Sequence, residues 1–260
     1  QLKNGKIVDI KNQVINLKGC NTGNWLMLEM WMLSYADKGI ADQYEFIKTL
    51  ENRFGKYKAE ELMDIYRSNW IQEKDFDIIK SFGMNTVRLP FDYKLLMDSD
   101  SKPFQLKKDA WYWLDLAIEI AKNKGLYIIF DMHGAPGRQS GMDHSGRSGY
   151  NKLWSNKNFQ DQTVWLWAEI SNRYKNERTV AAYDLLNEPW GSNEKNLKKR
   201  LNLRKKKNRY DKFKFRFYNK VQNGFLKLSR KRKNYVTINS NHNLSNNKKK
   251  VLNHILQLIK

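Results

Sequence analysis

The sequence predicts an α/β fold, a (β/α)8 TIM barrel of which the first four to five strand-helix units are recognisable. Three observations lead to this fold class. Helical and strand patterns alternate three times between residues 73 and 186, the strands are apolar on both faces, and no glycine-rich phosphate-binding motif follows any strand. The alternation indicates a parallel sheet covered by helices, and the missing motif favours a closed barrel over an open nucleotide-binding sheet.

The segment before residue 73 begins with a small predicted hairpin between Gly5 and Gly19, in which two apolar runs flank the polar residues 11–13. Two helical segments follow, around residues 44–54 and 59–66, with Gly55 between them. They precede the regular alternation of helices and strands. We therefore expect them to form an insertion near the mouth of the barrel.

Each regular unit is a helix with apolar residues at every third or fourth position, followed by an apolar strand. The helices are predicted over residues 73–82, 109–124 and around 164–176, and the strands over 85–90, 126–130 and 180–186. Gly83 and Gly125 close the first two helices, and Asp109 can cap the second. These units give three parallel strands after the first.

Charge divides the chain into two parts. The net charge is +21, but residues 1–190 hold 26 Lys and Arg against 25 Asp and Glu, whereas residues 191–260 hold 22 against two. One helix over 213–228 and one strand over 235–238, a fifth at most, are predicted in the basic part. We expect residues 1–191 to form the N-terminal half of the barrel. Residues 192–260 are expected to form a basic, low-complexity C-terminal segment, a truncated or frameshifted remainder.

The single cysteine, Cys20, excludes an intramolecular disulfide and a cysteine-based zinc site. No apolar run approaches the roughly 20 residues that cross a bilayer, so no membrane association is expected. The chain begins at Gln1 without a signal peptide. We expect that a leader or further sequence has been removed and that the protein is extracellular or secreted.

Polar residues stand at the predicted strand ends, where barrel enzymes carry their reactive groups. The four sets are Gly19-Cys20-Asn21, Arg88, Asp131 with His133, and Asn187-Glu188. Singly, each has a structural explanation: an ion-paired strand end for Arg88, a hydrogen-bonded loop histidine for His133, and a surface carboxylate before a turn for Glu188. Together, at four successive strand ends, they predict one site.

Several motifs resemble glycoside hydrolase family 5, the cellulase family, and most closely its exo-β-1,3-glucanase-like members. These motifs are GCNTGNWLMLEMW, NWIQEKDF, MNTVRLPFDY, DMHGAPGRQSGMDHSG and Leu185-Leu186-Asn187-Glu188-Pro189-Trp190. The resemblance covers about residues 5–191. It implies a glycosidase that acts on β-glucan polysaccharide or oligosaccharide as a monomer, without a cofactor or metal.

The resemblance also implies residue roles. Glu188, the Glu after Asn, would be the general acid/base. Arg88, His133 and Asn187 would support the subsite where the sugar ring is cleaved, and Glu29 would contact its hydroxyls. Tryptophans suit sugar stacking through their apolar faces. Of Trp25, Trp31, Trp154 and Trp190, we favour Trp190.

The sequence departs from the family in its second carboxylate. A retaining glycosidase needs a nucleophile about 5–5.5 Å from the acid/base, and in this family it is a Glu that ends the seventh strand. After Trp190 the only carboxylates are Glu194 and Asp211, and neither follows a predicted strand. No nucleophile can be assigned, so we expect little or no turnover. In addition, His144 stands where the resembled pattern usually has Asn.

Two other functions remain open at this point. The first is a non-catalytic carbohydrate-binding remnant, which would retain the acid/base without the nucleophile. The second is nucleic-acid binding by residues 192–260, where Lys and Arg clusters would neutralise phosphates and aromatic residues would stack on bases. The basic segment lacks a recognisable architecture, so nucleic acid is the less favoured partner.

Overall fold

The computed structural model describes residues 2–3, 6–8, 11–98, 101–190, 246 and 249. The chain divides into two compact units, residues 1–193 and residues 194–260. The helix predicted over 213–228, the strand predicted over 235–238 and the proposed nucleic-acid-binding clusters lie outside the described residues.

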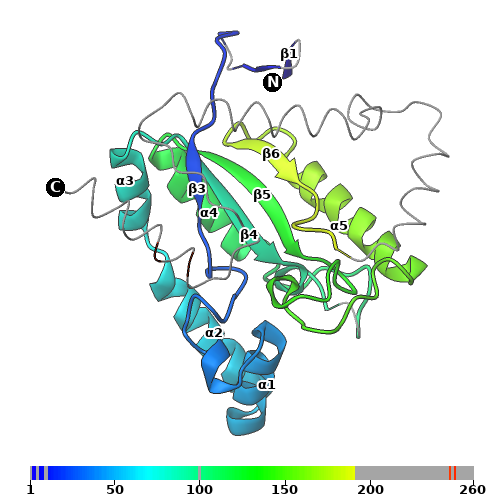
Figure 1. Cartoon of the computed structure of the whole chain (residues 1–260). Coiled ribbons are helices and arrows are strands. Elements are labelled where there is room, and N and C mark those ends of the chain that lie inside the picture. Colours follow the sequence, from blue (N-terminus) through cyan, green and yellow to red (C-terminus); the bar gives the residue numbers. More distant parts are fainter. Residues whose placement is uncertain are drawn as a thin grey trace. The chain divides into compact units, whose positions relative to one another are not determined.

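A four-stranded parallel sheet forms the centre of this unit (Figure 1). Its strands are β3 (Gly19–Asn21), β4 (Thr86–Asp92), β5 (Tyr127–Gly134) and β6 (Val180–Asp184). They lie in sequence order, so each new strand is added beside the one before it. A (β/α)8 barrel adds its strands in the same way, and four of its strands are present among the described residues.

One helix precedes each of the last three strands. These helices are α3 (Glu73–Ser81), α4 (Tyr112–Asn123) and α5 (Lys157–Tyr174). Gly83 and Gly125 follow the first two helices with φ of 73° and 62°, a conformation that glycine adopts without steric cost. The prediction that Asp109 caps the second helix is wrong. The N-cap position is Trp111, and the Asp109 carbonyl accepts a bond from the Tyr112 N–H.

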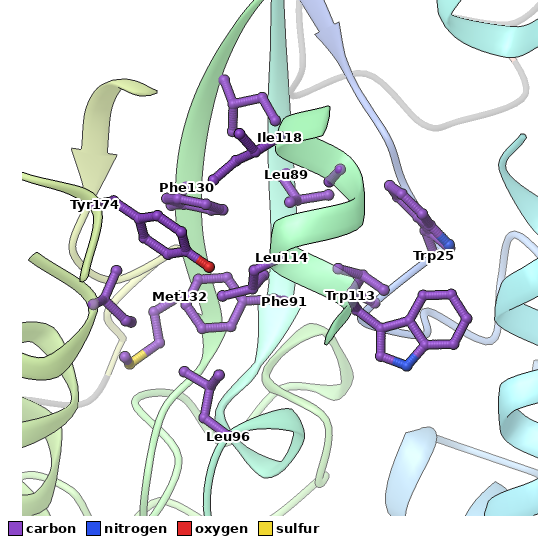
Figure 2. Close-up of a cluster of buried hydrophobic side chains, with 14 of the residues drawn as sticks. Trp25, Leu89, Phe91, Leu96, Trp113, Leu114, Ile118, Phe130, Met132 and Tyr174 are labelled. Carbon is purple, nitrogen blue, oxygen red and sulfur yellow. The ribbon is translucent and has the colours of Figure 1, made fainter. Parts of the chain in front are cut away.

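Alternation along the two central strands separates an apolar face from a polar one. Val87, Leu89 and Phe91 on β4, and Ile128, Phe130 and Met132 on β5, are fully buried, and the core they share with Leu114 and Ile118 of α4 is drawn in Figure 2. Each such side chain contributes roughly 1.5–3 kcal/mol to folding. The residues between them, including Arg88, Asp131 and His133, therefore point to the opposite face of the sheet.

The predicted insertion is a helix pair, α1 (Gln43–Phe54) and α2 (Lys56–Trp70), at the end of the sheet where the strands terminate (Figure 1). Side chains tie α2 to the loop after β3: Trp25 Nε1 donates to the Arg67 carbonyl (2.9 Å), and the Tyr66 hydroxyl donates to the Asn24 carbonyl (2.6 Å). Helix α2 is longer than the predicted span of 59–66 at both ends.

The N-terminal residues pair as antiparallel strands, β1 (Leu2–Lys3) with β2 (Lys6–Ile7), and an isolated bridge joins Val8 to Val14. The hairpin prediction is confirmed by this bridge. Residues 19–21, which were predicted to close the first barrel strand, make up the whole of that strand, β3. Three short 3-10 turns, η1 (Ala36–Lys38), η2 (Tyr93–Leu95) and η3 (Asp143–Ser145), lie in the loops. Among the described residues, no helix combines the length and apolar character that a membrane span requires.

Candidate active site

Arg88 is the centre of a charged cluster on the polar face of the sheet. Its Nη2 donates to Asp184 Oδ2 of β6 (2.7 Å) and to Asn187 Oδ1 (3.0 Å), and it lies 3.0 Å from Asp131 Oδ2 of β5. The predicted strand over 85–90 would place Arg88 near its end. This prediction is wrong, because β4 continues to Asp92 and Arg88 lies in its first half. The residues level with it are Ile129 of β5 and Ala182 of β6, and its side chain reaches Asp131 and Asp184 two positions further along these strands.

His133 joins this cluster to the loop after β3. Its Nδ1 lies 2.5 Å from Asp131 Oδ2, and its Nε2 lies 3.1 Å from Asn187 Nδ2 and 3.5 Å from Glu29 Oε1. One side chain beneath it, the fully buried Gln139, donates from Nε2 to the carbonyls of both His133 (2.6 Å) and Asn187 (2.9 Å). The ends of β5 and β6 are thus fixed to each other.

The cluster shifts the ionisation of its members. Burial alone lowers the pKa of His133, but hydrogen bonds to Asp131 and Glu29 outweigh it and raise that pKa to about 9. The hydrogen bond from His133 in turn lowers the pKa of Glu29. Burial raises the pKa of Asp131, whose Oδ1 has no hydrogen-bond partner in the described part of the chain.

Two neighbours of His133 Nε2 favour opposite protonation states. The Glu29 carboxylate favours a charged ring, whereas the Asn187 amide nitrogen favours an unprotonated Nε2. We assign the charged ring, because hydrogen bonds to charged groups contribute roughly 1.5–3 kcal/mol against 0.5–1.5 for neutral pairs. The Nε2–H then points to Glu29, and the Asn187 amide keeps its oxygen on Arg88.

Glu188 lies beside this cluster but outside its hydrogen bonds. Its side chain is 61% exposed, and its Oε2 lies 3.8 Å from Nδ1 of His144. The His144 ring stands edge-to-face to that of His133, with centroids 6.4 Å apart. The backbone of Glu188 has φ of 38°, an uncommon value for a non-glycine residue, and the Trp190 N–H closes the turn onto its carbonyl (2.8 Å).

The structure therefore brings four of the six predicted site residues into direct contact. Arg88, His133, Asn187 and Glu29 form one network, and Glu188 adjoins it through His144. The sixth, Trp190, is 67% exposed, and its carbonyl accepts from Asn151 Nδ2 (3.1 Å).

The tryptophans differ in what they can offer a sugar. Trp25 is buried, and Trp154 packs against the core with its Nε1 bonded to the Gln139 carbonyl. Trp31, by contrast, is 62% exposed while its Nε1 donates to Glu29 Oε2 (2.7 Å). An exposed indole fixed to a site carboxylate suits stacking at least as well as Trp190 does. Sequence reasoning passed over Trp31 because only its contact with Glu29 distinguishes it.

A buried ion pair supports the mouth and was not predicted. Asp92 Oδ2 at the end of β4 accepts from Arg138 Nη1 (2.8 Å) and from Gln43 Nε2 (2.5 Å), and Arg138 Nη1 also donates to the Ser145 carbonyl (2.7 Å). Both charged side chains are at least 96% buried. The pair thus joins β4, α1 and the loop after β5, three segments that are far apart in the sequence.

The arrangement suits recognition of a polar, hydroxyl-rich ligand. Within the described residues, no group of three His, Cys, Asp or Glu side chains could hold a metal ion. What the site presents is a charged imidazole, a carboxylate with a lowered pKa, an amide and an exposed indole. Each can form hydrogen bonds or stacking contacts with a sugar ring.

Curated proteins related to this chain match about three quarters of its length. A beta-xylosidase from Phanerodontia chrysosporium is 33% identical over 185 residues, which are 71% of this chain and 38% of that protein. A glucan 1,3-beta-glucosidase from Blumeria graminis is 34% identical over 200 residues, 74% of this chain and 45% of that protein. The chain thus spans less than half the length of these curated relatives.

Solved structures and a family model give the fold and the family. A rutinosidase from Aspergillus niger superposes with a TM-score of 0.57 at 21% identity, over 69% of this chain and 50% of that one. Together with the family, this confirms the prediction of a TIM-barrel fold with an incomplete set of units. The family model for cellulase matches residues 56–254, which include much of the basic segment. The chain belongs to the cellulase family, glycosyl hydrolase family 5.

Proposed function

We propose that this chain carries the acid/base half of a retaining β-glycoside hydrolase for β-glucan polysaccharide or oligosaccharide. The observation that supports the proposal most is the single network of Arg88, His133, Asn187 and Glu29 beside Glu188. Related glucan 1,3-beta-glucosidases favour a β-1,3-linked glucan as substrate.

In this proposal Glu188 donates its proton to the glycosidic oxygen, which is a poor leaving group without it. Glu29, held ionised by His133, accepts hydrogen bonds from sugar hydroxyls. Asn187 offers an amide to the same ring, and Arg88 holds Asn187 in place. Trp190 or Trp31 stacks on an apolar sugar face. The exposed side chain of Glu188 leaves it accessible to a substrate.

The reaction also needs a nucleophile, and the described residues offer no free candidate at the site. Glu29, Asp131 and Asp184 are each paired with His133 or Arg88. The remaining carboxylates after Trp190, Glu194 and Asp211, lie outside the described residues. We therefore expect little or no turnover, and a non-catalytic carbohydrate-binding remnant is the second candidate function.

The proposal also includes a domain boundary near residue 191, an out-of-frame segment after it, secretion and a monomeric state. Comparing the three reading frames of the coding DNA tests the frame. If neither of the other two frames encodes, downstream, a Glu at the end of a predicted strand, the out-of-frame hypothesis is contradicted.

Affinity electrophoresis in laminarin and an assay of released reducing sugar separate the two functions. We expect retarded migration with little or no sugar released. Release that disappears in Glu188→Gln would establish a hydrolase with a nucleophile of its own. Migration unaffected by laminarin, barley β-glucan or cellulose derivatives, with no release, would contradict both functions.

A further inference from the structure

His144 is the ion-pair partner of the proposed acid/base within the described residues. Its Nδ1 lies 3.8 Å from Glu188 Oε2, slightly beyond hydrogen-bonding distance, and the exposed Glu188 side chain can close this gap by rotation. Contacts at catalytic groups are often long in unliganded structures and shorten when a substrate binds. The geometry therefore allows a hydrogen bond between the two side chains.

The turn that carries His144 is held firmly. It is η3, in which the Ser145 hydroxyl donates to the carbonyl of Ser140 (2.8 Å), and the Gly146 N–H donates to that of Asp143 (2.7 Å). Arg138 donates to the Ser145 carbonyl, so the buried ion pair with Asp92 fixes the same turn. A side chain at position 144 consequently has a defined place beside Glu188.

The surroundings of the ring favour a proton on Nδ1. Nε2 of His144 is buried and has no hydrogen-bond partner among the described residues. An N–H at that position would be a buried donor without an acceptor, which proteins avoid more strictly than an unpaired acceptor. In a neutral ring the proton therefore belongs on Nδ1, the nitrogen that faces Glu188.

Other charges around His144 are consistent with this arrangement. His144 interacts electrostatically with Glu29, and its ring centroid lies 6.4 Å from that of His133. The Arg138 guanidinium lies beside Gly146, two residues after His144. Arg138 is neutralised by Asp92, and His133 by Asp131. Glu188 is the carboxylate that Nδ1 itself faces.

We propose that His144 is a positioning residue for Glu188, whose carboxylate accepts a hydrogen bond from His144 Nδ1–H after it has released its proton. The proposal rests on the acid/base role of Glu188. In that step the Glu188 proton moves to the glycosidic oxygen and the carbon–oxygen bond breaks, while His144 keeps its own proton. The His144 N–H then stabilises and orients the newly formed Glu188 carboxylate, because hydrogen bonds to ionised acceptors are stronger than those to neutral ones.

The test is the imidazole Nδ1–H signal of His144 in nitrogen-15 NMR spectra, recorded on the whole chain at mildly alkaline pH. The chain has four histidines, and the signal is assigned by its loss in His144→Asn. We expect an Nδ1–H proton that exchanges with water at least tenfold faster in Glu188→Ala than in the parent. Glu188→Gln keeps an acceptor oxygen and should give an intermediate rate.

The His133 Nδ1 signal in the same spectra verifies the fold, because that nitrogen is bonded to Asp131 and should not change. The matched control is Glu60→Ala, which removes an exposed carboxylate on α2. Equal exchange of the His144 proton in the parent and Glu188→Ala, or an Nδ1 without a proton, would overturn the proposal. Neither result depends on hydrolysis, so failure here is distinct from failure of the proposed function.

Discussion

The site residues at the end of β5 and after β6 differ in how firmly their side chains are held. At β5, His133 is 7% exposed at its side chain and Asp131 is fully buried, and both have charged partners. After β6, Glu188 is mostly exposed, and in the described part of the chain its one ion-pair partner is His144. The residues that would position a sugar are thus preorganised by the sheet, whereas the proton donor is fixed through loops.

The largest loss in the free energy of unfolding should come from a substitution in the loop after β5. Arg138→Met leaves Asp92 buried without its cation, and breaking a buried pair in this way costs about 3–5 kcal/mol. The measurement is the free energy of unfolding in urea. Arg173→Met is the matched control: it removes a half-exposed pair with Asp115 and should cost less than about 1 kcal/mol. Equal costs for the two variants would show that the loop is not held by its buried pair.

A smaller effect should come from the charge on His133. Its folded pKa of about 9 lies above the ordinary value of 6.5, so its contribution to stability is complete below pH 6.5 and is lost as the pH rises through 9. At about 1.4 kcal/mol per pKa unit, the loss reaches about 3 kcal/mol.

Urea unfolding at pH 6.5 and 9.5 measures this loss. His133→Asn places an amide near Nδ1 for Asp131 but cannot carry the charge, so its stability should change much less over the same interval. A parent protein with the same stability at both pH values would contradict the charged ring.

The smallest effect is expected at the end of β6. Glu188→Ala removes an exposed side chain with no buried contact to lose, so the free energy of unfolding should stay within about 0.5 kcal/mol of the parent. Urea unfolding again gives the value. A loss above about 2 kcal/mol would mean that Glu188 is part of the fold and that the contrast between the two strand ends is false.

Much of this fold follows from periodicity in the sequence. The alternation of Val87, Leu89 and Phe91 identifies the buried face of β4, and Gly83 and Gly125 mark the ends of two helices. The exact boundaries do not follow, because strand length depends on pairing: β4 extends to Asp92 since β5 continues beside it to Gly134.

The site was predictable to the extent that it sits on strands. Arg88 and His133 could be expected together, since neighbouring parallel strands end at one edge of the sheet. The partners of Arg88 and the Asp92–Arg138 pair could not be predicted, because they join residues far apart in the sequence, up to 99 positions for Arg88 and Asn187, and no local pattern encodes such pairings. The same applies to His144, which meets Glu188 only in the folded loop.

The central claim is that the Arg88–His133–Asn187–Glu29 network and Glu188 form one sugar-binding site. Calorimetric titration with a β-1,3-linked glucose disaccharide tests it directly, using Glu29→Gln to remove a charged acceptor and Glu60→Gln as the exposed control. We predict binding to the parent and the control, and at least tenfold weaker binding to Glu29→Gln, as loss of a hydrogen bond to a charged group implies. Equal affinity in all three proteins, or no binding to any, would contradict the claim.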